Sequence, residues 1–172
     1  MNRQSLTTCR IQKVVLSSCF GVHEPLLYNK VSEHLIKILK LSQKPKKCFC
    51  RNPVAKWKTR KGTTALGLML TLRKKEALRV LKLIMKDEEI DDLKYDRGSG
   101  SLRKGIVNHR GLGLERYDHT VPDYGFNYTI CFSYPGKRAW LRRINPCTKK
   151  IPRVSEEEAR EFLQKSLKEN DK

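Results

Sequence analysis

The chain has 172 residues, enough for one ordinary domain, and we interpret residues 1–172 as a single domain with a flexible tail over 1–9. Its formal net charge is +19 at pH 7, well above the magnitude of about 2–8 that keeps a small domain soluble. A surface this basic repels itself unless a polyanion neutralises it, so the expected partner is nucleic acid or an anionic membrane. No apolar run approaches the roughly 18 residues that would span a bilayer, and no secretory signal is expected.

Apolar patterning predicts the first elements in chain order. Residues 10–20 are rich in β-branched and apolar side chains and predict a strand. Residues 24–41 carry apolar side chains at helical spacing, and Pro25 suits a first helical turn, so a helix is expected. Residues 42–64 contain prolines and no acid, and they predict a loop or a pair of extended, projecting strands.

The remaining elements complete the fold class. Ser155 precedes three glutamates, which marks a helix start because the hydroxyl can cap and acids suit a helix N-terminus. The order predicts an α+β fold, with an antiparallel or mixed sheet, helices packed on one face and projecting basic loops. The predicted elements are a strand over 65–73, a helix over 74–85 ended by the acidic run 86–93, short strands near 103–108 and 112–117, a strand over 126–134, a basic loop over 137–153, and a C-terminal helix and tail over 155–172.

Two basic segments predict RNA binding. No acid occurs between Glu33 and Glu76, and none occurs in 137–153, so the chain is expected to bridge two RNA surfaces. Lys and Arg there can neutralise phosphates and release counterions, while Phe49 and Trp57 could stack on unpaired bases; Trp57 could equally anchor its loop in the core. Prolines break both segments, which disfavours a membrane-bound amphipathic helix. The predicted RNA-binding residues are Lys44, Lys46, Lys47, Arg51, Lys56, Trp57, Lys58, Arg60, Lys61, Arg97, Arg103, Lys104, Lys137, Arg138, Arg142, Arg143, Lys149, Lys150 and Arg153.

Motifs of catalysis are largely missing. The chain has no P-loop, and Gly111-Leu112-Gly113 lacks the third glycine of a dinucleotide fingerprint. Histidines show no metal spacing: we expect His34 to be exposed or half-buried, and His109 could contact RNA. The six cysteines include one close pair, Cys48-Phe49-Cys50, so zinc held by distant ligands is an alternative to free thiols. The sequence therefore predicts no cofactor, no metal and no enzyme.

Several passages, in order, resemble one known family, the L-five proteins of the large ribosomal subunit. RIQKVVLSSCFG (10–21) is similar to the family's first strand. LIKILKLSQKPKKCFCRNPVAKWKTRKG (35–62) is similar to its helix, its leucine-x-glycine-glutamine-lysine-proline motif, its basic loop and its arginine-x-glycine. Here Ser42 stands at the usual glycine. LGLMLTLR (66–73) resembles the strand that follows that loop.

The C-terminal part of the chain continues the resemblance, which covers roughly residues 10–165. YDRGSGSLRKGI (95–106) is similar to a family segment, with Ser99 and Gly100 in place of asparagine and tyrosine. YGFNYTICF (124–132) is similar to a later strand of the family.

The resemblance implies an α+β sheet with helices on one side and a structural role in the central protuberance of the large ribosomal subunit. It implies binding to 5S rRNA and to neighbouring large-subunit rRNA. Residues 44–61 would then face rRNA and the peptidyl-site (P-site) tRNA, and a protein of the small-subunit head would be a neighbour. An extra-ribosomal RNA chaperone or regulator that uses the same surface is the alternative.

Two features of the sequence bear on the compartment and point in different directions. Residues 135–153 are similar to the longer cytosolic and archaeal forms of the family. VAKWKTRKG (54–62) is more similar to mitochondrial members, and with the acid-free N-terminus it favours a mitochondrial ribosome over a cytosolic one. Some mitochondrial ribosomes lack 5S rRNA, so large-subunit rRNA is the firmer ligand.

Overall fold

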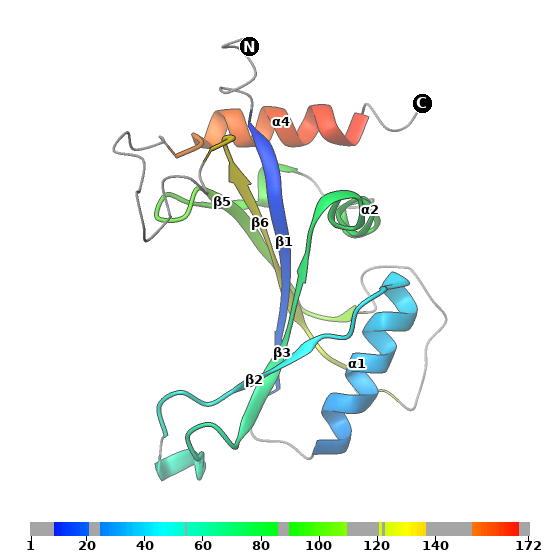
Figure 1. Ribbon diagram of the computed structural model, residues 1–172, viewed down its shortest axis with the longest axis vertical. Helices are drawn as coiled ribbons and strands as arrows, with labels where there is room; N and C mark the ends of the chain where they lie inside the picture. Colours follow the sequence, from blue (N-terminus) through cyan, green and yellow to red (C-terminus); the bar gives the residue numbers. More distant parts are fainter. Residues whose placement is uncertain are drawn as a thin grey trace.

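A six-stranded antiparallel sheet, in the order β2-β3-β1-β6-β5-β4, forms the centre of the molecule (Figure 1). The computed structural model describes residues 9–20, 25–53, 55–85, 90–109, 121, 123–136 and 153–168. Its elements are β1 (Arg10–Cys19), α1 (Pro25–Leu39), β2 (Lys46–Phe49), η2 (Ala55–Trp57), β3 (Ala65–Leu72), α2 (Lys74–Ile84), η3 (Ile90–Asp92), β4 (Lys94–Asp96), β5 (Ser101–Ile106), β6 (Phe126–Ser133) and α4 (Glu156–Lys168).

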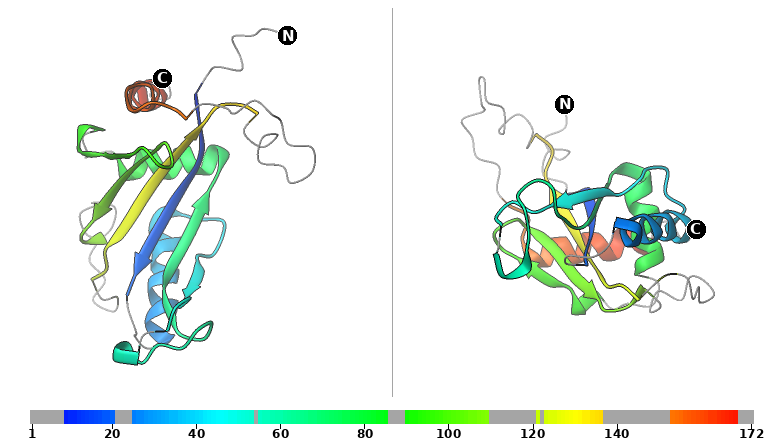
Figure 2. Two further views of the ribbon diagram at one scale, coloured as in Figure 1. Left: turned by 90° about the vertical axis from the view of Figure 1, so that its left-hand side faces the viewer. Right: turned by 90° about the horizontal axis from the view of Figure 1, so that it is seen from below.

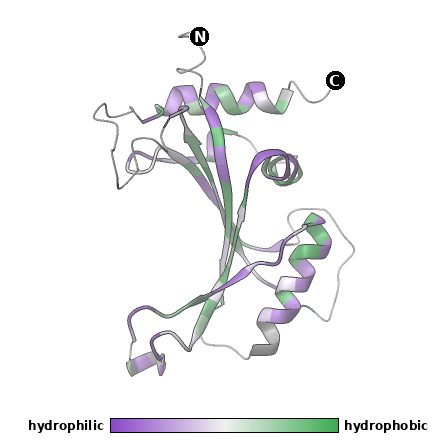
Figure 3. Cartoon of the chain, viewed as in Figure 1, coloured by the Kyte–Doolittle hydropathy of each residue, from purple (hydrophilic) through white to green (hydrophobic). Residues whose placement is uncertain are grey.

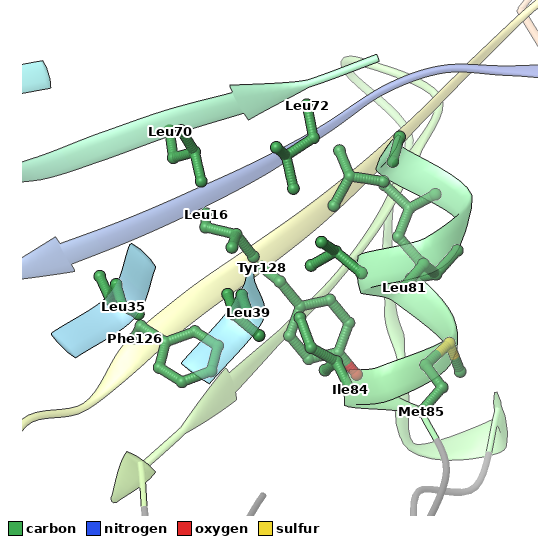
Figure 4. Packing of buried hydrophobic residues seen from close by; sticks show 14 of the residues in the cluster. Leu16, Leu35, Leu39, Leu70, Leu72, Leu81, Ile84, Met85, Phe126 and Tyr128 are labelled. Carbon is green, nitrogen blue, oxygen red and sulfur yellow. The ribbon is translucent and has the colours of Figure 1, made fainter. Parts of the chain in front are cut away.

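Helices α1 and α2 cover one face of this sheet (Figure 2, left). The even-numbered side chains of β6, and of β1 after its β-bulge between Ile11 and Lys13, point toward them, and Val14, Leu16 and Tyr128 are each at most 3% exposed. Figure 4 shows how the side chains of α1 and α2 pack over Leu70, Leu72 and their neighbours on the strands. Burying side chains of this size contributes about 1.5–3 kcal/mol each, so this layer holds the sheet in shape.

The third helix, α4, packs onto the same core at the end of the sheet opposite η2 (Figure 1). The rings of Phe162 and Phe132 meet edge to face, with centroids 6.4 Å apart, and Leu163 is fully buried. Ser155 caps the helix as predicted, because its Oγ accepts a hydrogen bond from the N–H of Glu158 at 3.3 Å. The expected α+β sheet with helices on one face is therefore confirmed.

The boundaries of the predicted elements hold with a few differences. Helix α1 ends at Leu39 rather than at 41, because Lys40 adopts φ 47° and the N–H of Leu41 donates to the carbonyl of Ile36 at 3.0 Å. Strand β4 was not predicted, and β5 begins at Ser101 rather than at 103. The strand expected near 112–117 falls outside the described residues.

The expectation that His34 is exposed or half-buried was wrong, and His109 is buried as well. His34 is 6% exposed and His109 is 7% exposed, so neither lies on the surface. The Nδ1 of His34 is 3.0 Å from the hydroxyl of Tyr124, and the His109 ring stacks on that tyrosine at a centroid distance of 4.4 Å. Aromatic and hydroxyl partners that are distant in sequence bury both imidazoles, and no spacing rule would have revealed them.

Candidate nucleic-acid interface

The sheet face opposite α1 and α2, which we call the open face, carries polar and basic side chains. Odd-numbered residues of β6, and of β1 from Lys13 onward, point toward it: Ser17 pairs with Asn127, and Val15 pairs with Thr129. No helix among the described residues covers this face (Figure 2, left). A sheet face that is both hydrophilic and uncovered is suited to bind a polar ligand.

The open face contains a depression of about 620 Å³. Its lining combines the exposed cations Lys94 and Arg103 with hydroxyl and amide groups, a donor set that suits phosphate and ribose oxygens. A side chain at Gly105 would bring its Cβ to 2.7 Å from the Oδ1 of Asn127, so glycine keeps this amide in place. The lining residues are Ser17, Asp92, Lys94, Arg103, Lys104, Gly105, Asn127 and Thr129.

The cations that line this depression differ in how far a neighbouring acid already neutralises them. The Nζ of Lys104 lies 3.1 Å from the Oδ2 of Asp92, and the lysine side chain is 24% exposed, so the carboxylate offsets much of its charge. Arg103, its neighbour on β5, is exposed. Phosphate binding on this edge is therefore expected to depend more on Arg103 than on Lys104.

The turn that joins β4 to β5 carries Arg97 and is contacted by Arg153. Hydrogen bonds from the hydroxyl of Ser99 and then from the N–H of Gly98 hold the pKa of Asp96 below its usual value. Arg153 donates from Nη1 to the carbonyl oxygen of Arg97 at 3.2 Å. The turn thus brings Arg97 and Arg153 together, although they are far apart in sequence.

The segment 50–64 is here called the basic tip, and its described residues, 50–53 and 55–64, form a hairpin end. The N–H of Cys50 donates to the carbonyl of Thr64, and the N–H of Gly62 donates to the carbonyl of Cys50, each at 2.9 Å. The tip lies at the end of the molecule opposite α4 and is strongly hydrophilic around η2 (Figure 3). Its exposed cations are Arg51, Lys56, Lys58, Arg60 and Lys61.

The sequence prediction of the 42–64 segment was partly right. One strand, β2, extends from the sheet and pairs with β3, while the rest forms the basic tip. Lys44, Lys46 and Lys47 are exposed beside it. The backbone of Trp57 lies in η2, and its side chain is outside the described part of the structure, as are Lys137, Arg138, Arg142, Arg143, Lys149 and Lys150.

Sequence reasoning missed the open face itself. Lys94 was not predicted as a site residue because β4 is only three residues long and gives no pattern. Alternation along β1 and β6 could have shown a polar row through Ser17, Asn127 and Thr129, since serine, threonine and asparagine there have no core partner.

The described residues show no sign of a different kind of site. Within these ranges, no three His, Cys, Asp or Glu side chains gather as metal ligands would. Cys9, Cys19, Cys48 and Cys50 are free thiols. No helix in the described part of the chain has the length and apolar character needed to cross a membrane.

Comparison with known proteins identifies relatives of this chain among archaeal ribosomal proteins. No protein-family model matches. The large ribosomal subunit protein uL5 of Thermoplasma acidophilum is 36% identical over 109 residues, which cover 60% of this chain and 62% of that protein. The uL5 of Methanosphaera stadtmanae is 26% identical over 79% of this chain and 81% of its own length. The uL5 of Methanocorpusculum labreanum is 27% identical over 89% of this chain and 90% of its own length.

These matches agree with one another and with the expected fold. All three relatives are uL5 proteins, and two of the alignments extend over most of both chains. They also support the prediction that the chain is not an enzyme, because uL5 proteins are structural parts of the ribosome. Together with the α+β sheet, they support the resemblance of this chain to the uL5 family of large ribosomal subunit proteins.

Proposed function

We propose that the chain is a structural constituent of the large ribosomal subunit that binds rRNA on the open face of its sheet. The observation that supports this most directly is the depression on that face, where Lys94 and Arg103 lie among hydroxyl and amide groups. Cations fix phosphates, and hydroxyl and amide groups can reach the 2′-hydroxyls and base edges that distinguish RNA. The net charge of +19 supplies the long-range attraction.

The basic tip provides a second contact on the same molecule. We propose that it reaches the P-site tRNA or nearby rRNA, because it projects from the end of the molecule opposite α4 (Figure 1). Its hydrogen-bonded hairpin end fixes the backbone that carries the cations before RNA binds, which lowers the entropy cost of docking. We also propose the central protuberance, 5S rRNA where it is present, and a small-subunit head protein as its surroundings.

For the compartment, we propose a mitochondrial ribosome. The acid-free N-terminus and the sequence 54–62 favour it. The similarity to archaeal relatives does not distinguish mitochondrial from cytosolic ribosomes. Gradient sedimentation of lysates from purified mitochondria and from cytosol tests both the function and the compartment. We expect co-migration with mitochondrial large subunits; co-migration with cytosolic large subunits would overturn the compartment alone, and appearance only in ribosome-free fractions would overturn the function.

The open face is tested directly with two matched charge variants. Lys94→Gln with Arg103→Gln should weaken binding to deproteinised large-subunit rRNA and reduce the slope of log affinity against log salt by about 1–2. Lys30→Gln with Lys75→Gln removes the same charge from exposed positions on α1 and α2 and should leave most of the affinity. An equal drop in affinity for the two variants would show that net charge, and not the open face, drives binding.

A further inference from the structure

Phe49 is unusual among the exposed side chains of the described residues. Three large apolar side chains are exposed there, Phe49 at 50%, Met69 at 40% and Val107 at 84%, and Phe49 is the aromatic one. An isolated exposed apolar residue is ordinary, so exposure alone assigns no role. The surroundings of the ring are what distinguish it.

The backbone of Phe49 is held on both sides. It ends β2, the outermost strand of the sheet, and pairs with Ala65 of β3. The next residue, Cys50, donates its N–H to the carbonyl of Thr64 at 2.9 Å and accepts a bond from Gly62. Alanine is too small to cover the ring, and no strand pairs with the outer edge of β2 in the described part of the chain, so a planar ligand can approach an already positioned phenyl group.

Exposed cations flank Phe49 along the chain, in a stretch of sequence that has no acid to offset them. Lys47 and Arg51 are exposed two residues before and after it. Exposed Lys61 precedes Gly62, whose N–H donates to the carbonyl of Cys50, the residue after Phe49. The sequence has no acid between Glu33 and Glu76. An aromatic ring flanked by positive charge matches a ligand that combines a flat π surface with phosphates on either side.

We propose that Phe49 is a stacking site for an unpaired nucleobase of the bound RNA, an assignment that rests on the proposed function. An unpaired base is the ligand rather than a duplex, because paired bases in A-form RNA are stacked on their neighbours and leave no face free for a ring. The neighbouring lysines and arginines hold the flanking phosphates. Phe49 thereby adds a contact that is independent of salt to a surface that otherwise binds through charge.

The test is a titration of the full chain with a single-stranded RNA that carries one 2-aminopurine as a fluorescent base. The RNA has about 12 nucleotides, a length within the range of known single-stranded binding sites. Phe49→Leu keeps an apolar side chain and removes the π surface, whereas Phe49→Trp keeps the π surface. We expect Phe49→Leu to weaken binding by about 5- to 100-fold with an unchanged salt slope, and to abolish the fluorescence change caused by stacking. Phe49→Trp should bind at least as well as the wild type.

Two controls separate the outcomes. Val107→Ala removes an exposed apolar side chain outside the basic tip and should leave the affinity for the single strand and the fluorescence change as they are in the wild type. The same RNA as a duplex should bind the wild type and Phe49→Leu equally. If Phe49→Leu binds the single strand within twofold of the wild type while the wild type binds with strong salt dependence, the stacking site is wrong and the proposed function stands. If the wild type does not bind RNA, both fail.

Discussion

The hydroxyl of Ser42 donates a hydrogen bond to Oε1 of Glu76 at 2.9 Å, and the backbone N–H of Ser42 donates to the same oxygen at 3.1 Å. One carboxylate on α2 therefore fixes the start of the excursion that carries the basic tip. Gln43 adds a bond from Nε2 to the carbonyl of Thr71 on β3 at 2.9 Å. The acid-free segment thus leaves the body of the protein in a defined direction.

Glu76→Ala should lower the free energy of unfolding by about 1 kcal/mol, because it removes two hydrogen bonds at a partly exposed site. Ser42→Ala should cost less, since the backbone bond stays. Urea unfolding of both single variants and the double variant gives the coupling energy. Glu33→Ala removes an exposed acid on α1 as the control; a double variant whose destabilisation is the sum of the two single values would contradict the interaction.

Lys40→Gly should stabilise the protein by about 0.5–1 kcal/mol. Lys40 ends α1 with φ 47°, a conformation that costs a residue with a Cβ more than it costs glycine. Lys40→Ala removes the same charge and keeps the Cβ, so it should bring little gain. If alanine stabilises as much as glycine in urea unfolding, charge and not backbone conformation is the cause.

Stability should fall as the pH rises above about 9. Burial, and secondarily the charge of Glu158, raises the pKa of Cys9 from 9.0 to about 12. Burial and a hydrogen bond to Glu158 raise the pKa of Tyr134 from 10.0 to about 12. The unfolded chain loses these two protons at a lower pH than the folded chain does. The stabilisation that the protonated side chains give the fold is therefore complete below their unfolded-state pKa values. It is lost as the pH rises through their folded-state pKa values.

Unfolding by urea at about pH 8 and at about pH 10.5 measures this decrease, since the two values bracket the start of the window. Cys9→Ala should show a smaller fall between the two than the wild type. Cys19→Ala, which removes an exposed thiol, should retain the wild-type fall. A fall of equal size in all three proteins would assign alkaline sensitivity to other groups.

Arg160→Met should destabilise the protein by about 1–3 kcal/mol, because the guanidinium is 22% exposed and joins α4 to η3. It donates to the carbonyl of Ile90 at 2.7 Å, to the carbonyl of Leu93 at 2.8 Å and to the carboxylate of Glu156 at 2.8 Å. Arg160→Lys should rescue little, since an ammonium lacks this planar fork. Full rescue by lysine in thermal unfolding would mean that only the charge matters.

A triple variant of the basic tip, with Lys56, Lys58 and Arg60 changed to Gln, should bind RNA with a weaker dependence on salt, measured as the slope of log affinity against log salt concentration. The slope should fall by about 0.7–0.9 for each phosphate that the variant no longer neutralises. The charge-matched control is a second triple variant that changes three exposed helix residues to Gln: Lys30, Lys75 and Lys165. A wild-type slope in the triple variant of the tip would remove the basic tip from the RNA interface.

The sequence was most informative where local patterns decide structure. Strand β1, helices α1 and α2, and the Ser155 cap were predicted because each depends on apolar spacing or on neighbouring residues. Strand β4 could not be predicted, since three residues with no alternation form it only through pairing with β5. The place of Lys94 on the open face could not be predicted for the same reason.

Long-range contacts account for the rest. The burial of His34 depends on Tyr124, 90 positions later in the chain, and the pairing of Lys104 with Asp92 depends on how η3 packs. Composition predicted that cations would bind RNA, and it could not show which cations are already neutralised. Which cations are neutralised depends on where the acids lie in the folded protein, and the net charge carries no information about position.

The place of β1 in the sheet also determines the order in which the protein can form during its own synthesis. β1 is made first and lies between β3 and β6. The part formed by β1, β2, β3, α1 and α2 has all its residues once position 84 has left the ribosome, whereas β6 cannot complete its pairing with β1 before position 133 has been made. Until then, one edge of β1 carries unpaired N–H and C=O groups, so the nascent chain must be kept from pairing with other strands while its own partner is still being translated.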